Sequence, residues 1–386
     1  MNIGFDLHNI RDGGGPNYVR NLIEAADPER DGFTMLHLFG SPKVLDYFPE
    51  KPFVCKHPLT ELGRSLPFRT WFVATKLPAL LRKFKCDVLY SPGGIAFGNF
   101  RPYATISRNM MPFSPEFWGM YPIFSGDRVR LHLLRWLNAA TFSRADGMIY
   151  LTDTAHQRIG PLLGPHAAPF EIIAHGVDHA RFTPTRHHVK PGLGNSVQAR
   201  IVYPSRLEPY KKQVEVIHAF ADHLTEFPNL RLELCGPANP TYLEAVNSAI
   251  AYAATRGREV VYLGELSNAE LPLLYANSDM MVFASSCENL PNILIEALAS
   301  AIPICCSNCS PMPEVAQDAC HYFNPSNPVD IAAAIREMLT DQNEALKRAD
   351  RGVQQAQKHQ WTVTSQRTFA FLGTVVRNGQ QIQEIS

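Results

Sequence analysis

Two glutamates separated by seven residues mark the stretch of this chain that is best suited to chemistry. Glu288 precedes Pro291 and Asn292, and a run of good helix formers containing Glu296 follows. Proline suits the first position of a helix and asparagine suits a cap or turn, which predicts a helix from about residue 291 to about residue 300. Glu288 then lies in the loop before the helix and Glu296 in its early turns, so both carboxylates can face one crevice. The N–H groups at the helix start offer a site for an oxyanion or a sugar oxygen.

A second set of candidates is basic. Arg206, Lys211 and Lys212 follow a short apolar run at 200–205 and precede a predicted helix at 213–224. An arginine at the end of a strand and a lysine at the start of the next helix can converge on one phosphate. A solvated loop would account for either lysine taken singly. Of the two we favour Lys212, because it is nearer the helix start.

A glycine-rich turn at 12–15 lies between an apolar run at 3–8 and a helical pattern that begins near residue 18. Backbone amides in such a turn can approach a phosphate closely. The turn lacks the G-x-G-x-x-G spacing of a dinucleotide site, and it equally suits a tight turn without a ligand.

Short apolar runs alternate with helical stretches along the chain, which is the pattern of parallel α/β sheets. The run at 280–284 ends just before Glu288, and the run at 302–306 follows the helix, so the glutamates belong to a strand–loop–helix–strand unit. In open parallel sheets ligands bind beyond the carboxyl ends of the strands, where Glu288 falls. Further predicted strands are 34–39, 53–55, 87–90, 104–107, 148–151, 230–235 and 260–263.

The length and the charge of the chain limit its domain organisation and its possible partners. A chain of 386 residues exceeds what one core usually supports, so two domains are expected. The formal net charge of zero argues against a dedicated nucleic-acid binder. Residues 61–145 nevertheless carry twelve Lys/Arg against four Asp/Glu, an excess of eight positive charges. This excess suits anionic lipid headgroups or a phosphorylated acceptor, although it is equally compatible with a solvated surface.

The sequence predicts a cytoplasmic protein that can lie on a membrane surface. The first residues lack the basic start and apolar length of a signal peptide, and no uncharged apolar stretch is long enough to span a bilayer. Residues 69–85 mix aromatic, aliphatic and basic side chains. They form either an amphipathic membrane-surface helix or a core-packed helix broken near Pro78, and we favour the second.

An ordered set of motifs across some fifty residues supports a family resemblance. The motifs are Tyr275-Ala276-Asn277-Ser278-Asp279, Glu288-x7-Glu296, Ala301-Ile302-Pro303-Ile304, Met312-Pro313-Glu314 and Tyr322-Phe323-Asn324-Pro325. This segment resembles the donor-binding half of family 4 retaining glycosyltransferases with the GT-B fold. The resemblance implies two Rossmann-like parallel-sheet domains facing across a cleft. We expect an acceptor-side domain at 1–184, a linker at 185–199, a nucleotide-sugar domain at 200–360 and a terminal helix at 361–386 that crosses back to the first domain.

The resemblance also implies roles for the candidates. Arg206 and Lys212 would grip the donor pyrophosphate, Glu296 would hold the ribose hydroxyls, and Glu288 would accept hydrogen bonds from the donor sugar. We therefore expect Arg206, Lys212 and Glu288 to act in catalysis. The expected donor-binding set is Gly14, Gly15, Arg206, Lys211, Lys212, Leu266, Asn289, Leu290, Asn292 and Glu296.

One motif departs from the family pattern. Many relatives carry a histidine followed by an aspartate where this chain has Arg108 and Asn109. These two residues are acceptor-side candidates together with Phe113 and Trp118. The aromatic pair could line an acceptor cleft, because sugar faces stack on aromatic rings, or could pack as core.

No metal or other cofactor is expected. The sequence contains no Asp-x-Asp of the kind that holds a divalent ion in many transferases, so protein cations and helix N–H groups must meet the charge of the leaving diphosphate. A C-x-x-C is present at Cys306 and Cys309, but a zinc site would need a second pair, and we favour packing.

These points predict a retaining, metal-independent transfer of a hexose from a nucleotide-diphosphate sugar, with GDP-mannose favoured by the family. The acceptor would be a lipid-linked or polysaccharide chain of a cell-surface glycan such as an O-antigen or exopolysaccharide. A nucleotide-sugar 2-epimerase of the same fold is the first alternative, and an inert nucleotide-sugar-binding module is the second.

Overall fold

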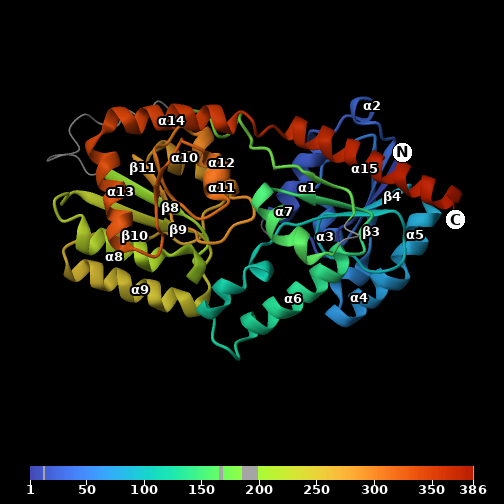
Figure 1. The fold of residues 1–386 in the computed structure, drawn as a ribbon, viewed down its shortest axis with the longest axis horizontal. Coiled ribbons are helices and arrows are strands. Elements are labelled where there is room, and N and C mark those ends of the chain that lie inside the picture. Colours follow the sequence, from blue (N-terminus) through green and yellow to red (C-terminus); the bar gives the residue numbers. More distant parts are fainter. Residues whose placement is uncertain (12–13, 165–167, 185–198, 386) are drawn as a thin grey trace. The chain divides into compact units, whose positions relative to one another are not determined.

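A computed structural model describes residues 1–11, 14–164, 168–184 and 199–385 (Figure 1). The predicted linker at 185–199 lies, apart from Ala199, outside the described residues. The chain forms two compact units. The first comprises Met1–Pro115, Tyr121–Gly176 and Gln360–Ser386, and the second comprises Glu116–Met120 and Val177–His359.

The first unit ends earlier than the predicted boundary at residue 184. The Val177 N–H donates to the His359 carbonyl over 3.0 Å, and the Phe182 ring lies 6.1 Å from the Tyr275 ring, centroid to centroid. These contacts attach residues 177–184 to the second unit.

A seven-stranded parallel sheet forms the first unit, in the order β3-β2-β1-β4-β5-β6-β7. Most of its central strands are buried along their whole length, which explains why their sequences are short unbroken apolar runs. The strands are β1 (Asn2–Asp6), β2 (Met35–Gly40), β3 (Val54–Pro58), β4 (Val88–Ser91), β5 (Tyr103–Ile106), β6 (Gly147–Tyr150) and β7 (Phe170–Ile172).

Helices cover both faces of this sheet. They are α1 (Gly14–Glu24), α2 (Pro28–Asp31), α3 (Pro42–Leu45), α4 (Leu66–Thr75), α5 (Leu77–Lys83), α6 (Gly126–Phe142), α7 (Asp153–Ile159) and α15 (Trp361–Ile385). The red helix α15 runs beside α1 in Figure 1. Its close approach to the sheet requires Gly147, because a Cβ there would lie 2.4 Å from Val375 Cγ2.

The segment predicted as one broken helix is the pair α4 and α5. The break falls at Lys76, and Pro78 takes an early position in α5, where its missing N–H is not needed. Phe72 and Leu81 are buried in a hydrophobic cluster, whereas Trp71 is 50% exposed. The pair is therefore core-packed, as favoured from the sequence, and keeps one exposed aromatic residue.

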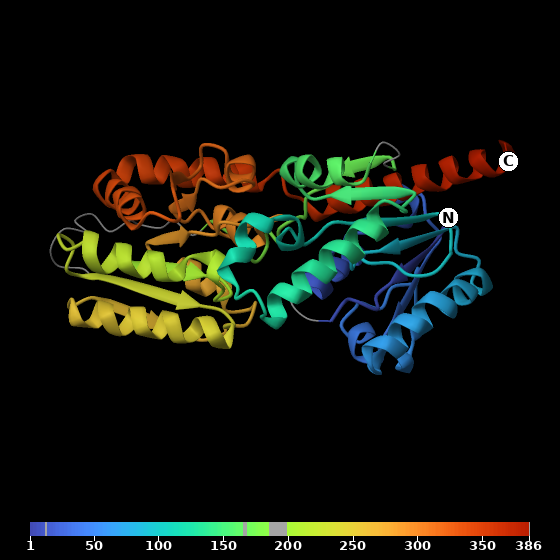
Figure 2. The same cartoon turned by 60° about the horizontal axis from the view of Figure 1, so that its bottom comes forward.

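A six-stranded parallel sheet forms the second unit, in the order β10-β9-β8-β11-β12-β13. Figures 1 and 2 show α8 and α9 side by side against it. Its strands are β8 (Ala199–Pro204), β9 (Leu230–Cys235), β10 (Glu259–Tyr262), β11 (Met280–Phe283), β12 (Ile304–Ser307) and β13 (His321–Phe323). Its helices are α8 (Gln213–His223), α9 (Pro240–Thr255), α10 (Leu271–Ala276), α11 (Asn292–Ala299), α12 (Met312–Ala316), α13 (Pro328–Thr340) and α14 (Gln342–Ala356).

Candidate active site

The two loops that carry the predicted donor residues meet at one edge of the second sheet. Strands β8 and β11 are parallel neighbours, with Val202 opposite Met281, so the loops after them leave the same edge. Ser286 joins the loops, because its N–H and its hydroxyl both donate to the Tyr210 carbonyl over 2.8 Å. Residues that are about 80 positions apart in the chain therefore face one another.

Lys211 and Glu288 form an ion pair across these loops. Their side chains are 11% and 15% exposed, so water screens the pair little. The Lys211 Nζ also lies 5.3 Å from the ring centroid of Tyr210 and 5.4 Å from that of Phe283. A lysine held in this way is a fixed positive charge that can accept a second anionic partner.

Lys212 points elsewhere. Its backbone is in the left-handed region, with φ of 60°, at the start of α8. Its Nζ lies 2.8 Å from Oε1 of Glu215, three residues on. The structure thus places Lys211 beside Glu288, although the sequence analysis favoured Lys212.

Arg206 has its guanidinium at the solvent edge of the same loop. Its side chain is 56% exposed, and Nε lies 3.2 Å from Oε1 of Glu208. The Arg206 carbonyl accepts a hydrogen bond from Nε2 of the fully buried Gln213 over 3.0 Å, which holds the loop in place. The side chain is therefore exposed to solvent beside Glu208, while its backbone carbonyl is held by Gln213.

Glu296 lies in the second turn of α11 and is half-buried. Its Oε2 atom is covered and accepts no hydrogen bond from the described residues. Burial raises the pKa of this carboxyl to about 8, and the positive charge of Arg181 only partly offsets that rise. A covered carboxyl without a partner is costly in a folded protein and indicates a place for hydrogen-bond donors from a ligand.

The start of α11 lies between the two glutamates. The predicted residues Asn289 and Leu290 are buried in the loop before it, and the Asn292 N–H donates to the Leu290 carbonyl over 3.0 Å. In the described residues no side chain caps this helix start, so the positive end of the helix dipole is available to an anion.

Leu266 lies half-buried in the loop after β10, which is tied to the neighbouring loops. The Gly236 N–H donates to the Gly264 carbonyl over 2.8 Å. Gly236 has φ of 135°, and a Cβ there would lie 2.4 Å from the Ser205 carbonyl oxygen. Arg181, which sequence reasoning missed, donates to the Asn268 carbonyl in this loop. The carboxyl ends of four neighbouring strands thus form one connected set of loops.

In the first unit, Gly14 and Gly15 begin α1 and lie against Arg108. A Cβ on either glycine would come within 3.6 Å of the Arg108 guanidinium. That guanidinium also lies 5.2 Å from the Tyr18 ring centroid. The Arg108 Nε is covered and has no hydrogen-bond partner among the described residues, and burial lowers the pKa of the side chain. Arg108 is therefore a half-buried positive charge that no carboxylate of the described residues pairs with.

A cavity of about 430 Å³ opens beside Arg108. It lies at the carboxyl ends of β1, β4 and β5, and one face of α6 closes it. Its described lining contains three arginines and three asparagines but no carboxylate. The lining residues are Asn9, Ile10, Arg11, Gly15, Pro92, Gly93, Gly94, Ile95, Arg108, Asn109, Arg130, Leu134, Asn138 and Phe142. The sequence analysis named Gly15, Arg108 and Asn109 among them, and it missed Arg11 and the helix that supplies Arg130.

Phe113 and Trp118, the aromatic acceptor-side candidates, are 3% and 6% exposed. The Phe113 ring stacks on the Phe142 ring, with centroids 5.9 Å apart. Of the two roles left open for these aromatics, packing is the one the structure shows. Cys305 and Cys306 are likewise fully buried in β12.

The segment that contains the donor-side loops matches a known family. Residues 188–359 match the family model described as glycosyl transferases group 1. These residues form a group 1 glycosyl transferase domain. Arg206, Lys211, Glu288 and Glu296 all lie in it. The match confirms the predicted family and, with it, a transferase as the enzyme class of this group 1 domain.

Curated relatives share part of the chain. The O-antigen chain mannosyltransferase B of Escherichia coli is 33% identical over 107 residues, which is 28% of each protein. A GDP-mannose-dependent α-(1-6)-phosphatidylinositol monomannoside mannosyltransferase of Mycobacterium tuberculosis is 26% identical over 248 residues, or 59% of each. The alignments cover from about a quarter to about three fifths of these relatives' length.

Solved structures resemble the whole chain. Sucrose-phosphate synthase from Thermosynechococcus elongatus aligns with a TM-score of 0.71 at 16% identity, over 100% of this chain and 99% of that one. Anabaena HepE in complex with UDP-glucose aligns with a TM-score of 0.68 at 17% identity, over 96% and 98%. At these identities the likeness concerns the fold alone, and the predicted GT-B fold is confirmed. No helix in the described part of the chain is both long enough and apolar enough to cross a membrane.

Proposed function

We propose that the chain is a retaining, metal-independent glycosyltransferase that moves a hexose from a nucleotide-diphosphate sugar to a lipid-linked or polysaccharide acceptor of a cell-surface glycan. One observation carries this proposal. A paired lysine, Glu288, an uncapped helix start and the covered carboxyl of Glu296 converge at one sheet edge within the group 1 domain. GDP-mannose is the favoured donor, because the relatives named above are mannosyltransferases.

Each donor group has a partner in this arrangement. Lys211, the exposed Arg206 side chain and the positive end of the α11 dipole would neutralise the leaving diphosphate without a metal ion. Glu296 would accept hydrogen bonds from both hydroxyls of the ribose, which supplies the partners that its carboxyl lacks. Glu288, held by Lys211, would accept from hydroxyls of the donor sugar.

The reaction would proceed on one face of the donor sugar. The bond from the anomeric carbon to the phosphate oxygen breaks, and the acceptor oxygen bonds to the same face. The departing phosphate oxygen takes the acceptor's proton, so no protein base is required at Arg108. The product keeps the anomeric configuration of the donor, which NMR of the product measures directly. An inverted product would contradict this course.

The cavity in the first unit is suited to an anionic acceptor. Arg108 is half-buried with no carboxylate partner among the described residues, and Arg11 and Arg130 line the same space. Burying a cation without a counter-charge costs on the order of several kcal/mol of desolvation free energy. A phosphate on the acceptor would offset this cost, as a lipid diphosphate or a sugar phosphate would provide.

A membrane surface is the proposed location of that acceptor. Helix α6 exposes Val129, Leu133 and Trp136 at helical spacing, and Phe124 just before it is 95% exposed. The helix also carries Arg128 and Arg135. Exposed large apolar side chains beside arginines suit the interface of an anionic lipid layer.

Thermal stabilisation by nucleoside diphosphates tests the donor site. UDP, GDP, ADP and dTDP are each added to the wild type and to Glu296→Ala, with and without EDTA. We expect one nucleotide to raise the melting temperature of the wild type only, by the same increment in EDTA. If no nucleotide raises it, or if the variant responds equally, the donor-site assignment is wrong.

A further inference from the structure

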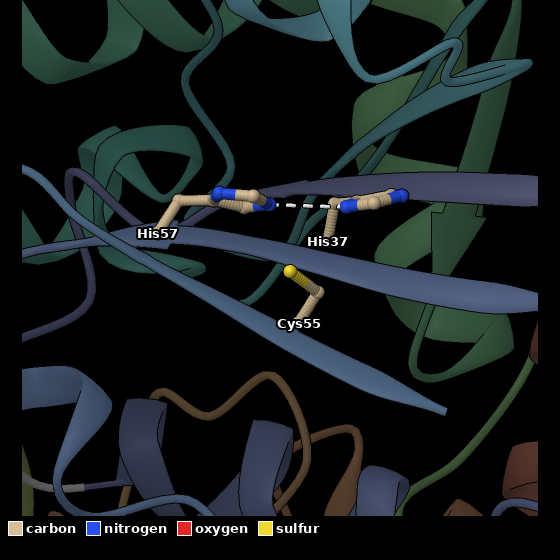
Figure 3. A group of neighbouring side chains, drawn as sticks. All are labelled: His37, Cys55 and His57. Atoms are coloured by element: carbon tan, nitrogen blue, oxygen red, sulfur yellow. Dashed lines mark hydrogen bonds between the residues drawn. The ribbon is translucent and has the colours of Figure 1, made fainter. Parts of the chain in front are cut away.

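Three potential metal ligands lie together in the first unit, away from the residues assigned above. His37 is on β2, and Cys55 and His57 are on the edge strand β3. The two strands are parallel neighbours with His37 opposite Cys55, and His57 follows Cys55 by two residues. Because side chains alternate along a strand, all three leave the sheet on the same face, as Figure 3 shows.

Their ligand atoms are close enough to share one ion. Nδ1 of His37 lies 3.0 Å from Nε2 of His57. One ring nitrogen of each histidine and the Cys55 Sγ all lie within 4.8 Å of one another. Around a tetrahedral zinc ion, bonds of about 2.0–2.3 Å place neighbouring ligand atoms roughly 3.3–3.8 Å apart. Changes of up to about 1 Å in these separations would bring the three atoms to that geometry.

Aromatic neighbours hold the imidazole of His57 in place. The His57 ring centroid lies 4.1 Å from that of Phe84 and 4.6 Å from that of Phe39.

We propose that His37, Cys55 and His57 bind one divalent transition-metal ion, with water in the fourth position. Two imidazoles and a thiolate are ligands that suit Zn²⁺. The ion would join the edge strand β3 to β2 and so stabilise a strand that has only one neighbour in the sheet. This site is independent of glycosyl transfer, and the proposal stands or falls separately from the proposed function.

A hydrogen bond between the two histidines accounts for the 3.0 Å contact without any metal. The role of Cys55 separates the two explanations, because a histidine pair does not need the thiol. Cys309 provides a matched control, since it is also a free, half-buried cysteine and lies outside the group.

The test is titration of the metal-free full chain with Co²⁺ and with Zn²⁺. We expect one ion per chain, a thiolate-to-cobalt charge-transfer band, and a higher melting temperature with Zn²⁺. Replacing a neighbour of a metal ligand weakens binding by about 10–100-fold, so Cys55→Ser, which removes a ligand, should weaken it by at least about 100-fold and abolish the band. Cys309→Ser should behave as the wild type.

Three results would overturn the proposal: no binding at micromolar metal, cobalt binding without the thiolate band, or equal affinity in Cys55→Ser. The melting temperatures of all variants are compared in EDTA, where Cys55→Ser should match the wild type if it folds normally. His57→Gln provides a second ligand-removing variant and should also lose the ion. EDTA should lower the wild-type melting temperature whether or not a nucleotide is present, which separates this effect from donor binding.

Discussion

Replacing Glu296 with glutamine should change how donor binding responds to pH. In the ligand-free protein burial raises the pKa of this carboxyl from its ordinary 4.5 to about 8. At pH 6 most molecules therefore carry the protonated form. A carboxylate can accept hydrogen bonds from both ribose hydroxyls, whereas the protonated group must donate one bond. Donor binding should therefore require loss of a proton below pH 8.

The magnitude follows from that pKa. Each pH unit below about 8 costs about 1.4 kcal/mol of binding free energy, which is tenfold in Kd. The Kd of the donor should fall about 100-fold between pH 6 and pH 8 and then level. Glutamine does not titrate, so the Kd of Glu296→Gln should stay constant. Above pH 8 the wild type should bind more tightly by about 1.5–3 kcal/mol, the worth of hydrogen bonds to a charged group.

Calorimetric titration with the intact nucleotide sugar is the appropriate assay, because its phosphodiester groups do not ionise in this range. A 2′-deoxy donor is the control, since it lacks one of the two hydroxyls and should lose most of the pH dependence. A constant wild-type Kd, or an equal slope in the variant, would refute the assignment of Glu296 to the ribose.

Stability without ligand gives a second readout of the same group. A carboxyl with a raised pKa binds its proton more tightly in the folded than in the unfolded protein. The free energy of unfolding should therefore fall as pH rises from 4.5 to about 8, by up to about 5 kcal/mol from this group. Glu296→Gln should lack this decrease and be the more stable protein at pH 8. Urea unfolding at several pH values measures it.

Further substitutions test the other assignments. Lys211→Met should lower kcat/KM by about 10²–10³, the cost of one charge-assisted contact in a desolvated site. Lys212→Met should lower it less than tenfold, because the Lys212 side chain pairs with Glu215. The reverse order of the two effects in steady-state kinetics would make Lys212 the residue that binds the diphosphate. Gly236→Ala should reduce the free energy of unfolding by about 2–5 kcal/mol, because the backbone conformation is strained for alanine and the new Cβ overlaps the Ser205 carbonyl. A loss below about 0.5 kcal/mol in urea unfolding would contradict this close approach. Arg108→Met should raise the free energy of unfolding by about 1–3 kcal/mol, because it removes a half-buried charge that pairs with no carboxylate of the described residues. It should also raise KM for the acceptor but not for the donor, and an unchanged acceptor KM would remove Arg108 from the acceptor site.

The strands and the helix α11 were predictable because their signals are local. A strand that is buried on both faces must be an unbroken apolar run, as at Met280–Phe283. Pro291 and Asn292 mark the start of a helix through residue types that lie within a few positions of that start. The motif from Glu288 to Glu296 is read in the same way. Its two carboxylates belong to one loop and the helix that follows it, so their spacing in the chain limits their spacing in space.

The choice between Lys211 and Lys212 was not local. The two residues are identical and adjacent, and the left-handed backbone of Lys212 directs its side chain to Glu215. Only the structure shows that Lys211 meets Glu288. Arg181 was missed for a similar reason, because its effect on Glu296 crosses more than a hundred residues of chain.

The amino-acid sequence by itself determined the types of group present and the local elements that carry them: apolar strands, glycine turns, helix starts, and the cations and carboxylates beside them. The tertiary structure decided which of these groups lie together. His37 lies near Cys55 and His57 through the register of two strands, and Arg108 and Arg130 line one cavity because α6 borders the space at the carboxyl ends of the strands. Strand order, register and helix packing depend on contacts distant in the chain, so residue spacing alone does not reveal them.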